Sequence, residues 1–167
     1  NVTEGEISAA VEAEKAKVAK VGNITVNLTA GAAYTIANTI EAPAGIIING
    51  NGATIDASAL GANFIQSAVT EEAKTVDSIA VLNVTVKGLG KALYYSAGKN
   101  IGISNFVVDN SVIEMAKDVV VFDFTKGSAA MNFAVKNSTI YAPTATTKSI
   151  YSSQGGEKGD AYGATVD

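Results

Sequence analysis

The sequence of 167 residues contains no cysteine, histidine, tryptophan or arginine. Without cysteine and histidine the chain has no disulfide, no thiolate nucleophile, no Ser-His-Asp triad and none of the usual zinc-ligand sets. Its 12 basic residues are all lysines and stand against 16 acidic residues, for a net charge of −4. This balance argues against nucleic-acid binding, which needs a basic surface. Carboxylates, lysines, hydroxyls and amides are left to carry any function.

Long apolar runs are missing as well. Runs such as residues 119–122 are far too short to span a bilayer, so we expect no transmembrane segment. Apolar residues make up 47% of the chain and charged residues 17%, which is typical of a globular domain with a buried core. The length predicts a single domain over residues 1–167.

The N-terminal residues have a helical pattern. Thr3 and Glu6 have the spacing of a capping box, in which each side chain bonds to the backbone of the other residue. An apolar stripe at helical spacing follows, made of Ile7, Ala10, Val11, Val18 and Val21. Gly22 is a natural helix stop. The pattern predicts a capping helix over residues 3–21 that covers one end of a β structure.

An internal repeat follows. Segments 79–86, 106–113 and 133–140 align without gaps at one constant interval, and each has an asparagine at its fifth position. A solenoid explains the equal spacing, because each strand then stacks on the same strand of the next turn, about 4.8 Å away. We therefore expect an all-β fold with about five coils over residues 23–153. Residues 154–167 are expected to form a flexible tail or the start of a further segment.

The recurring asparagines are Asn83, Asn110 and Asn137. Stacked at one corner of a solenoid, their amides can bond to one another and to backbone groups that the bend leaves unpaired. We interpret them as a structural ladder rather than as catalytic residues.

These features resemble a known superfamily. The capping helix, the Asn-Gly-Asn-Gly run at 49–52 and the repeated strands are similar to the pectate-lyase-like right-handed parallel β-helix superfamily. More narrowly, they resemble uncharacterised β-helix domains of surface or secreted lipoproteins of gut Bacteroidetes. The resemblance implies a right-handed parallel β-helix, an extracytoplasmic location at the bacterial cell surface, as an outer-membrane lipoprotein or secreted protein, and flanking domains in the full-length protein.

The resemblance also implies which catalytic sets to look for. Several enzymes of the superfamily need arginine or histidine, which this chain lacks, so only a lyase that uses lysine and carboxylates with Ca²⁺ stays open. Its best residues are Asp109, Glu114, Lys117, Asp118, Asp123 and Lys136. Asp109 and Lys136 are one repeat apart and are expected to form an ordinary surface pair. We assign no catalytic residue, no metal and no cofactor, with Ca²⁺ expected only for the lyase alternative.

A second column of strands suggests a binding surface. If Leu93, Tyr95, Phe122 and Phe124 point inward, then Tyr94 and Asp123 point outward, and Tyr151 joins them if the last turn is offset by one residue. An aromatic ring beside a carboxylate is typical of a carbohydrate platform. The sequence favours a noncatalytic module that binds or presents toward polysaccharide. A polysaccharide lyase and a purely structural or adhesin spacer remain alternatives.

Overall fold

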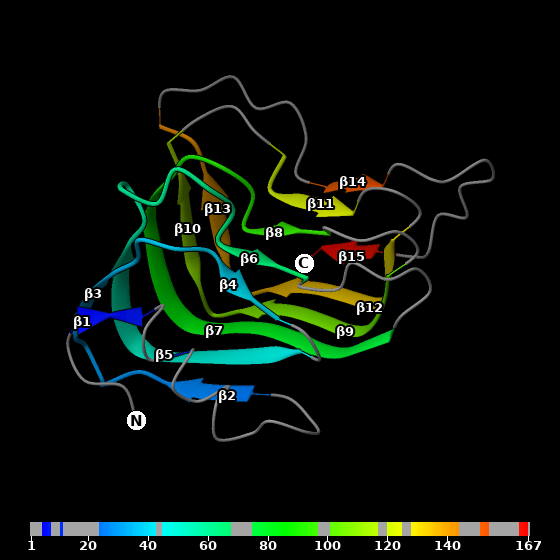
Figure 1. The fold of residues 1–167 in the computed structure, drawn as a ribbon, viewed down its shortest axis with the longest axis horizontal. Helices are drawn as coiled ribbons and strands as arrows, with labels where there is room; N and C mark the ends of the chain where they lie inside the picture. Colours follow the sequence, from blue (N-terminus) through cyan, green and yellow to red (C-terminus); the bar gives the residue numbers. More distant parts are fainter. Residues whose placement is uncertain are drawn as a thin grey trace.

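The protein forms a parallel β-solenoid in the computed structural model (Figure 1). The structure describes residues 5–7, 11, 24–42, 45–67, 75–96, 101–116, 120–124, 128–143, 151–153 and 164–166. About three turns of solenoid lie in this part of the chain. Every strand pair among the described residues is parallel. The all-β solenoid predicted from the repeat is therefore confirmed.

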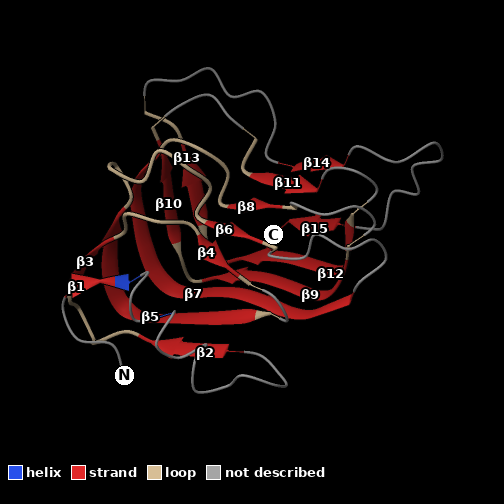
Figure 2. Cartoon of the chain, viewed as in Figure 1, coloured by secondary structure: helices blue, strands red, loops and turns tan. Residues whose placement is uncertain are grey.

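The strands form two sheets, and strands make up most of the described chain (Figure 2). The central path of the ten-stranded sheet is β1 (Gly5–Glu6), β3 (Ala33–Thr35), β5 (Ile46–Asp56), β7 (Thr75–Leu89), β9 (Gly102–Asp109), β12 (Ala129–Lys136) and β15 (Ala164–Val166). The same sheet includes β2 (Ile24–Asn27) beside β5, and β10 (Val112–Met115) between β7 and β13 (Thr139–Tyr141). The five-stranded sheet contains β4 (Ile40–Glu41), β6 (Ile65–Gln66), β8 (Tyr94–Tyr95), β11 (Phe122–Phe124) and β14 (Tyr151–Ser153).

The aligned segments of the sequence are vertical neighbours. Ile79 of β7 pairs with Phe106 of β9, and Phe106 pairs with Phe133 of β12. All three side chains are buried. Since side chains of a strand alternate between its two faces, the fixed interval keeps the same positions inside in each turn.

A cluster of aromatic rings packs between the two sheets, within a core that is otherwise mainly aliphatic. Phe106 of the ten-stranded sheet lies 5.5 Å from Phe122 of the five-stranded sheet and 5.4 Å from Phe133, measured between ring centroids. These separations are those of favourable aromatic pairs, which add to the free energy of burial. The rings hold the two sheets together.

The ten-stranded sheet bends at a corner marked by asparagines. Asn51, Asn83, Asn110 and Asn137 have φ angles of 51°, 53°, 47° and 48°, in the left-handed region that asparagine tolerates better than most residues. Gly50 is needed beside them, because a Cβ atom there would lie 2.4 Å from the Cβ of Val84. The Asn-Gly-Asn-Gly run thus forms a bulged corner inside β5, where the register with β7 shifts.

The N-terminus differs from the prediction. Gly5 and Glu6 form β1, which pairs with Tyr34 and Thr35 of β3, so the prediction that these two residues belong to the capping helix is wrong. In a helix that begins at Thr3, the N–H groups of Gly5 and Glu6 would lie in the first turn and lack an intrahelical acceptor, whereas β3 offers a strand edge with which the backbone can pair.

Most of the predicted helix, residues 3–21, lies outside the described residues. Ile7 and Val11 of its apolar stripe are described, and both are buried in the core. The capping helix and the count of five coils remain predictions. In the described part of the chain, no helix has the length and apolar character needed to cross a membrane.

Candidate functional site

Tyr94, predicted to face a ligand, lies in the core instead. Its side chain is 0% exposed and its ring lies 5.2 Å from the rings of Phe106 and Phe124. Burial raises the pKa of Tyr94 to about 12, although the neighbouring hydroxyls of Ser67 and Ser96 act in the opposite direction. The prediction that Tyr94 points outward is wrong, and Tyr94 is not available to a ligand.

The prediction for Tyr94 fails because consecutive turns differ by one residue in the length of the segment between the corner and the five-stranded sheet. Phe122 is the partner of Tyr94, but it lies one position farther from Asn110 than Tyr94 lies from Asn83. The additional residue between the corner and β11 places Phe122 beside Tyr94, both buried. Tyr95, predicted to point inward, is instead half-buried.

The structure separates Tyr94 from Asp123, two of the three residues predicted to form the ligand platform. Asp123 is half-buried and pairs with Tyr95, not with Tyr94. Partial burial raises the pKa of the Asp123 carboxyl. Tyr151 pairs through its backbone with Phe122, and its side chain lies outside the described part of the chain. Tyr94 and Asp123 therefore occupy opposite faces of the five-stranded sheet.

Four asparagines, Asn27, Asn49, Asn83 and Asn110, form a chain of hydrogen bonds, here called the amide ladder. The Nδ2 atom of Asn49 donates to Oδ1 of Asn27 at 3.2 Å, and Nδ2 of Asn83 donates to Oδ1 of Asn49 at 3.1 Å. The Nδ2 atom of Asn110 donates to Oδ1 of Asn83 at 2.9 Å. All three bonds run in the same direction along the solenoid, so each amide strengthens the next.

Asn137 does not continue the ladder. Its Nδ2 atom donates to Oδ1 of Asp109 at 3.0 Å, although the φ angle of Asn137 matches that of Asn110. The structure thus brings Asn83 and Asn110 together and places Asn137 on a different partner. Asn110 is the last amide of the ladder.

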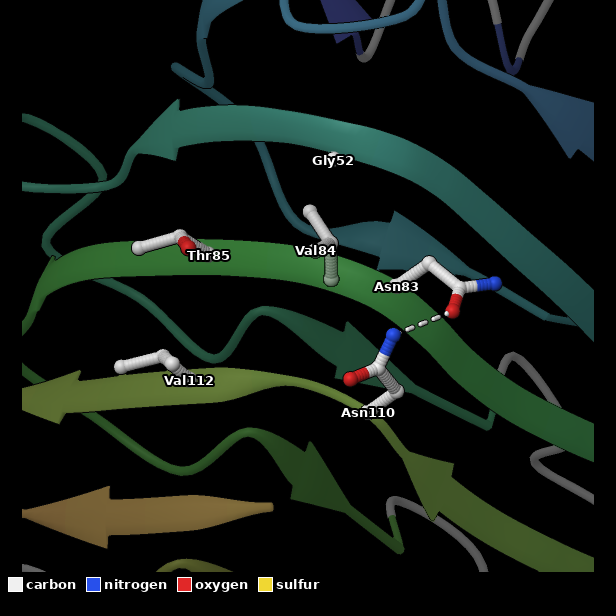
Figure 3. A pocket seen from close by; sticks show the side chains of 6 residues that line it. All are labelled: Gly52, Asn83, Val84, Thr85, Asn110 and Val112. Atoms are coloured by element: carbon white, nitrogen blue, oxygen red, sulfur yellow. Dashed lines mark hydrogen bonds between the residues drawn. The ribbon is translucent and has the colours of Figure 1, made fainter. Parts of the chain in front are cut away.

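A small depression, here called the corner hollow, lies beside the end of the ladder (Figure 3). Its volume is about 110 Å³, well above the ~10–15 Å³ that one water molecule needs. It is lined by Gly52, Asn83, Val84, Thr85, Asn110 and Val112. None of these side chains is charged: Asn83, Asn110 and Thr85 contribute polar groups and Val112 an apolar one, while the Val84 side chain lies in the core.

An exposed tyrosine lies on β13, the strand beside the one that carries Val112. The Tyr141 hydroxyl donates to Oε2 of Glu114 at 2.9 Å, and this bond raises the pKa of Tyr141. The Tyr141 side chain is 41% exposed. Glu114 also accepts a bond through Oε1 from the backbone N–H of Gly88, at 3.3 Å. Two protein groups thus hold the carboxylate in place.

Strand periodicity places Glu114 and Tyr141 on the same side of the sheet as the hollow. Glu114 lies two residues after Val112, Tyr141 lies two residues after Thr139, and both pairs are in register between β10 and β13. We call Thr85, Val112, Glu114, Thr139 and Tyr141 the outer face. The sequence reasoning missed Tyr141, yet it lies one repeat after Glu114, so the spacing that paired Asp109 with Lys136 could have found it.

The acidic residues considered for a lyase do not gather in the described part of the chain. Asp109 and Lys136 are neighbours in the register of β9 and β12, as their spacing predicts, and Asp109 accepts a hydrogen bond from Asn137, while Glu114 bonds to Tyr141 and Gly88. Lys117 and Asp118 lie outside the described residues. Among the described residues, no group of three or more histidine, cysteine, aspartate or glutamate side chains is arranged to hold a metal ion.

Residues 7–143 match a protein family described as Domain of unknown function (DUF4957). The chain belongs to this family. The DUF4957 match includes the corner hollow, the amide ladder and the outer face up to Tyr141. No curated protein and no solved structure gives a significant match to the chain.

Proposed function

We propose that the chain is a noncatalytic, extracytoplasmic module of a larger bacterial surface protein and that it binds polysaccharide through the outer face. The observation that carries this proposal is the exposed ring of Tyr141, fixed by its hydrogen bond to Glu114. The resemblance to the pectate-lyase-like superfamily and to Bacteroidetes surface lipoproteins supports the location and the class of ligand.

The outer face offers the contacts that a sugar needs. The C–H side of a pyranose stacks on an aromatic ring, and Tyr141 presents such a ring to solvent. A carboxylate accepts up to about four hydrogen bonds, so Glu114 keeps acceptor capacity for sugar hydroxyls besides the bonds from Tyr141 and Gly88. Thr85 and Thr139 add hydroxyls on the same side of the sheet.

Glycan-array screening followed by calorimetric titration tests the proposal. We expect Tyr141→Ala to weaken binding of the best glycan by ~10-fold or more, because the stacking surface is lost. Met131→Ala is the matched control: Met131 is a second large apolar side chain that is exposed, at 65%, but it lies on β12 before the corner. Its removal should leave affinity unchanged.

Three results would contradict the proposal. Absence of binding to any glycan on the array would favour the structural or adhesin spacer. Release of unsaturated uronate from pectin, assayed with and without Ca²⁺, would favour the lyase. Equal losses in Tyr141→Ala and Met131→Ala would show that the outer face is not the binding surface.

A further inference from the structure

We propose that the corner hollow is a subsite for an acetamido group, so that the module prefers polysaccharides containing N-acetylated amino sugars. This inference rests on the proposed glycan binding and specifies the sugar that the site selects. It is carried by the end of the amide ladder, by the uncharged lining of the hollow and by the position of Tyr141.

The end of the ladder leaves an acceptor available. Asn110 donates through Nδ2 to Asn83, and its Oδ1 atom accepts no hydrogen bond from any described residue. Asn137, which could have supplied the next donor, bonds to Asp109. In Figure 3 the Oδ1 atom of Asn110 points away from Asn83, on the side of Val112. A ligand N–H that binds there would extend a chain of amides already polarised in one direction.

The rest of the hollow matches the other atoms of an acetamido group. Val112 provides an apolar surface for the methyl group, and Thr85 provides a hydroxyl that can donate to the carbonyl oxygen. Gly52 keeps one side open, since no heavy atom lies within 4 Å of the position its Cβ would take. A plain sugar hydroxyl would use the acceptor of Asn110 and leave the apolar surface uncovered.

The register of the strands places the hollow within reach of the stacking ring. Val112 pairs with Thr139 of the next strand, and Tyr141 follows two residues later. One strand spacing of about 4.8 Å and two residues of about 3.3 Å each separate the hollow from the ring. A pyranose that stacks on Tyr141 can therefore direct a ring substituent toward Asn110.

Calorimetric titration with two matched tetrasaccharides tests the inference. One is the β-1,4-linked tetramer of N-acetylglucosamine, and the other is the β-1,4-linked tetramer of glucose, which differs by the acetamido groups. We expect the acetylated tetramer to bind ~10-fold or more tightly, because the glucose tetramer leaves Val112 and one amide contact unmatched. Thr85→Val should reduce this preference by several-fold, whereas Asn137→Ala, one repeat after Asn110 but outside the hollow, should keep it.

A second measurement guards against a variant that fails to fold. In the unaltered protein, the acetylated tetramer should shift the side-chain amide NMR signal of Asn110 and leave that of Asn137 in place. Equal affinity for the two tetramers, with loss of both in Tyr141→Ala, would overturn the acetamido subsite and leave the proposed function standing. Failure of either tetramer and of every array glycan to bind would overturn both.

Discussion

The two sheets of the solenoid differ in how evenly their strands are spaced along the chain. In the ten-stranded sheet, Ile79, Phe106 and Phe133 pair in turn and are separated by the same interval. In the five-stranded sheet the interval between paired residues is shorter than this from β4 to β6, and it is longer from β6 to β8 and from β8 to β11. The repeat therefore predicts which residues face the core in the first sheet, and it misassigns them in the second.

Alanine substitutions of Tyr94 and Tyr95 test this difference directly and should give the largest effect. Tyr94→Ala removes a fully buried ring with two aromatic neighbours and should lower the free energy of unfolding by ~3–5 kcal/mol. Tyr95→Ala removes a half-buried side chain and should cost less than about 1 kcal/mol. Urea unfolding of both variants measures the difference. A larger loss for Tyr95→Ala would restore the register expected from the repeat.

Even within the ten-stranded sheet, residues at equal spacing should contribute unequally to the free energy of unfolding. Asn110→Ala removes the last amide of the ladder and its exposed bond to Asn83, and should cost ~0.5–1.5 kcal/mol. Asn137→Ala loses a bond to Asp109 that is equally exposed but lies outside the ladder, and should cost less. Because both residues have positive φ, the glycine variants at the two positions serve as controls that remove the side chain without backbone strain. If thermal unfolding shows equal losses for the two glycine variants, the ladder has no stabilising role of its own.

The smallest expected effect concerns two carboxylates, one on each sheet, whose pKa values shift in opposite directions. Hydrogen bonds from Ser58 lower the pKa of Asp56 from 3.8, so the ionised form stabilises the fold above that pH and the benefit is lost as pH falls through the folded pKa. Partial burial raises the pKa of Asp123, so its stabilising contribution is present below 3.8 and is lost as pH rises through the folded pKa.

The two asparagine variants should therefore respond oppositely at neutral pH. Asp56→Asn should lower the free energy of unfolding and Asp123→Asn should raise it, each by less than about 1 kcal/mol because both groups remain partly solvated. Both differences from the unaltered protein should shrink at about pH 3, below the ordinary carboxyl pKa. Unfolding curves at the two pH values check the signs, and destabilisation by Asp123→Asn at neutral pH would contradict the account.

The sequence predicted the structure correctly where a pattern repeats, and it failed where contacts with nearby residues determine the hydrogen-bond partner or the secondary structure. The interval between Asn83 and Asn110 predicted their stacking, because only vertical neighbours explain equal spacing. It did not predict the partner of Asn137, because a nearby carboxylate, Asp109, competes with the amide of Asn110 for the same donor. The edge of β3 likewise outweighed the helical pattern at Glu6.

The candidate site was harder to predict than the fold. The Asn-Gly-Asn-Gly run indicated a tight corner, but the hollow arises from the way Gly52 of β5 and Val112 of β10 meet across β7. The position of Tyr141 one repeat after Glu114 in the sequence could have predicted that the two residues are neighbours. Its exposure depends on where β13 lies at the side of β10, which no local pattern specifies.

The strands β12 and β13 follow β9 and β10 at one constant interval along the chain, so the solenoid can be lengthened or shortened by whole turns. Duplication of one such interval would add one turn and keep every inward-facing side chain in the core. Insertion of a single residue inside a strand would instead turn core side chains toward water. Natural length variants of this fold should therefore differ by whole turns, gained or lost between the two ends of the solenoid.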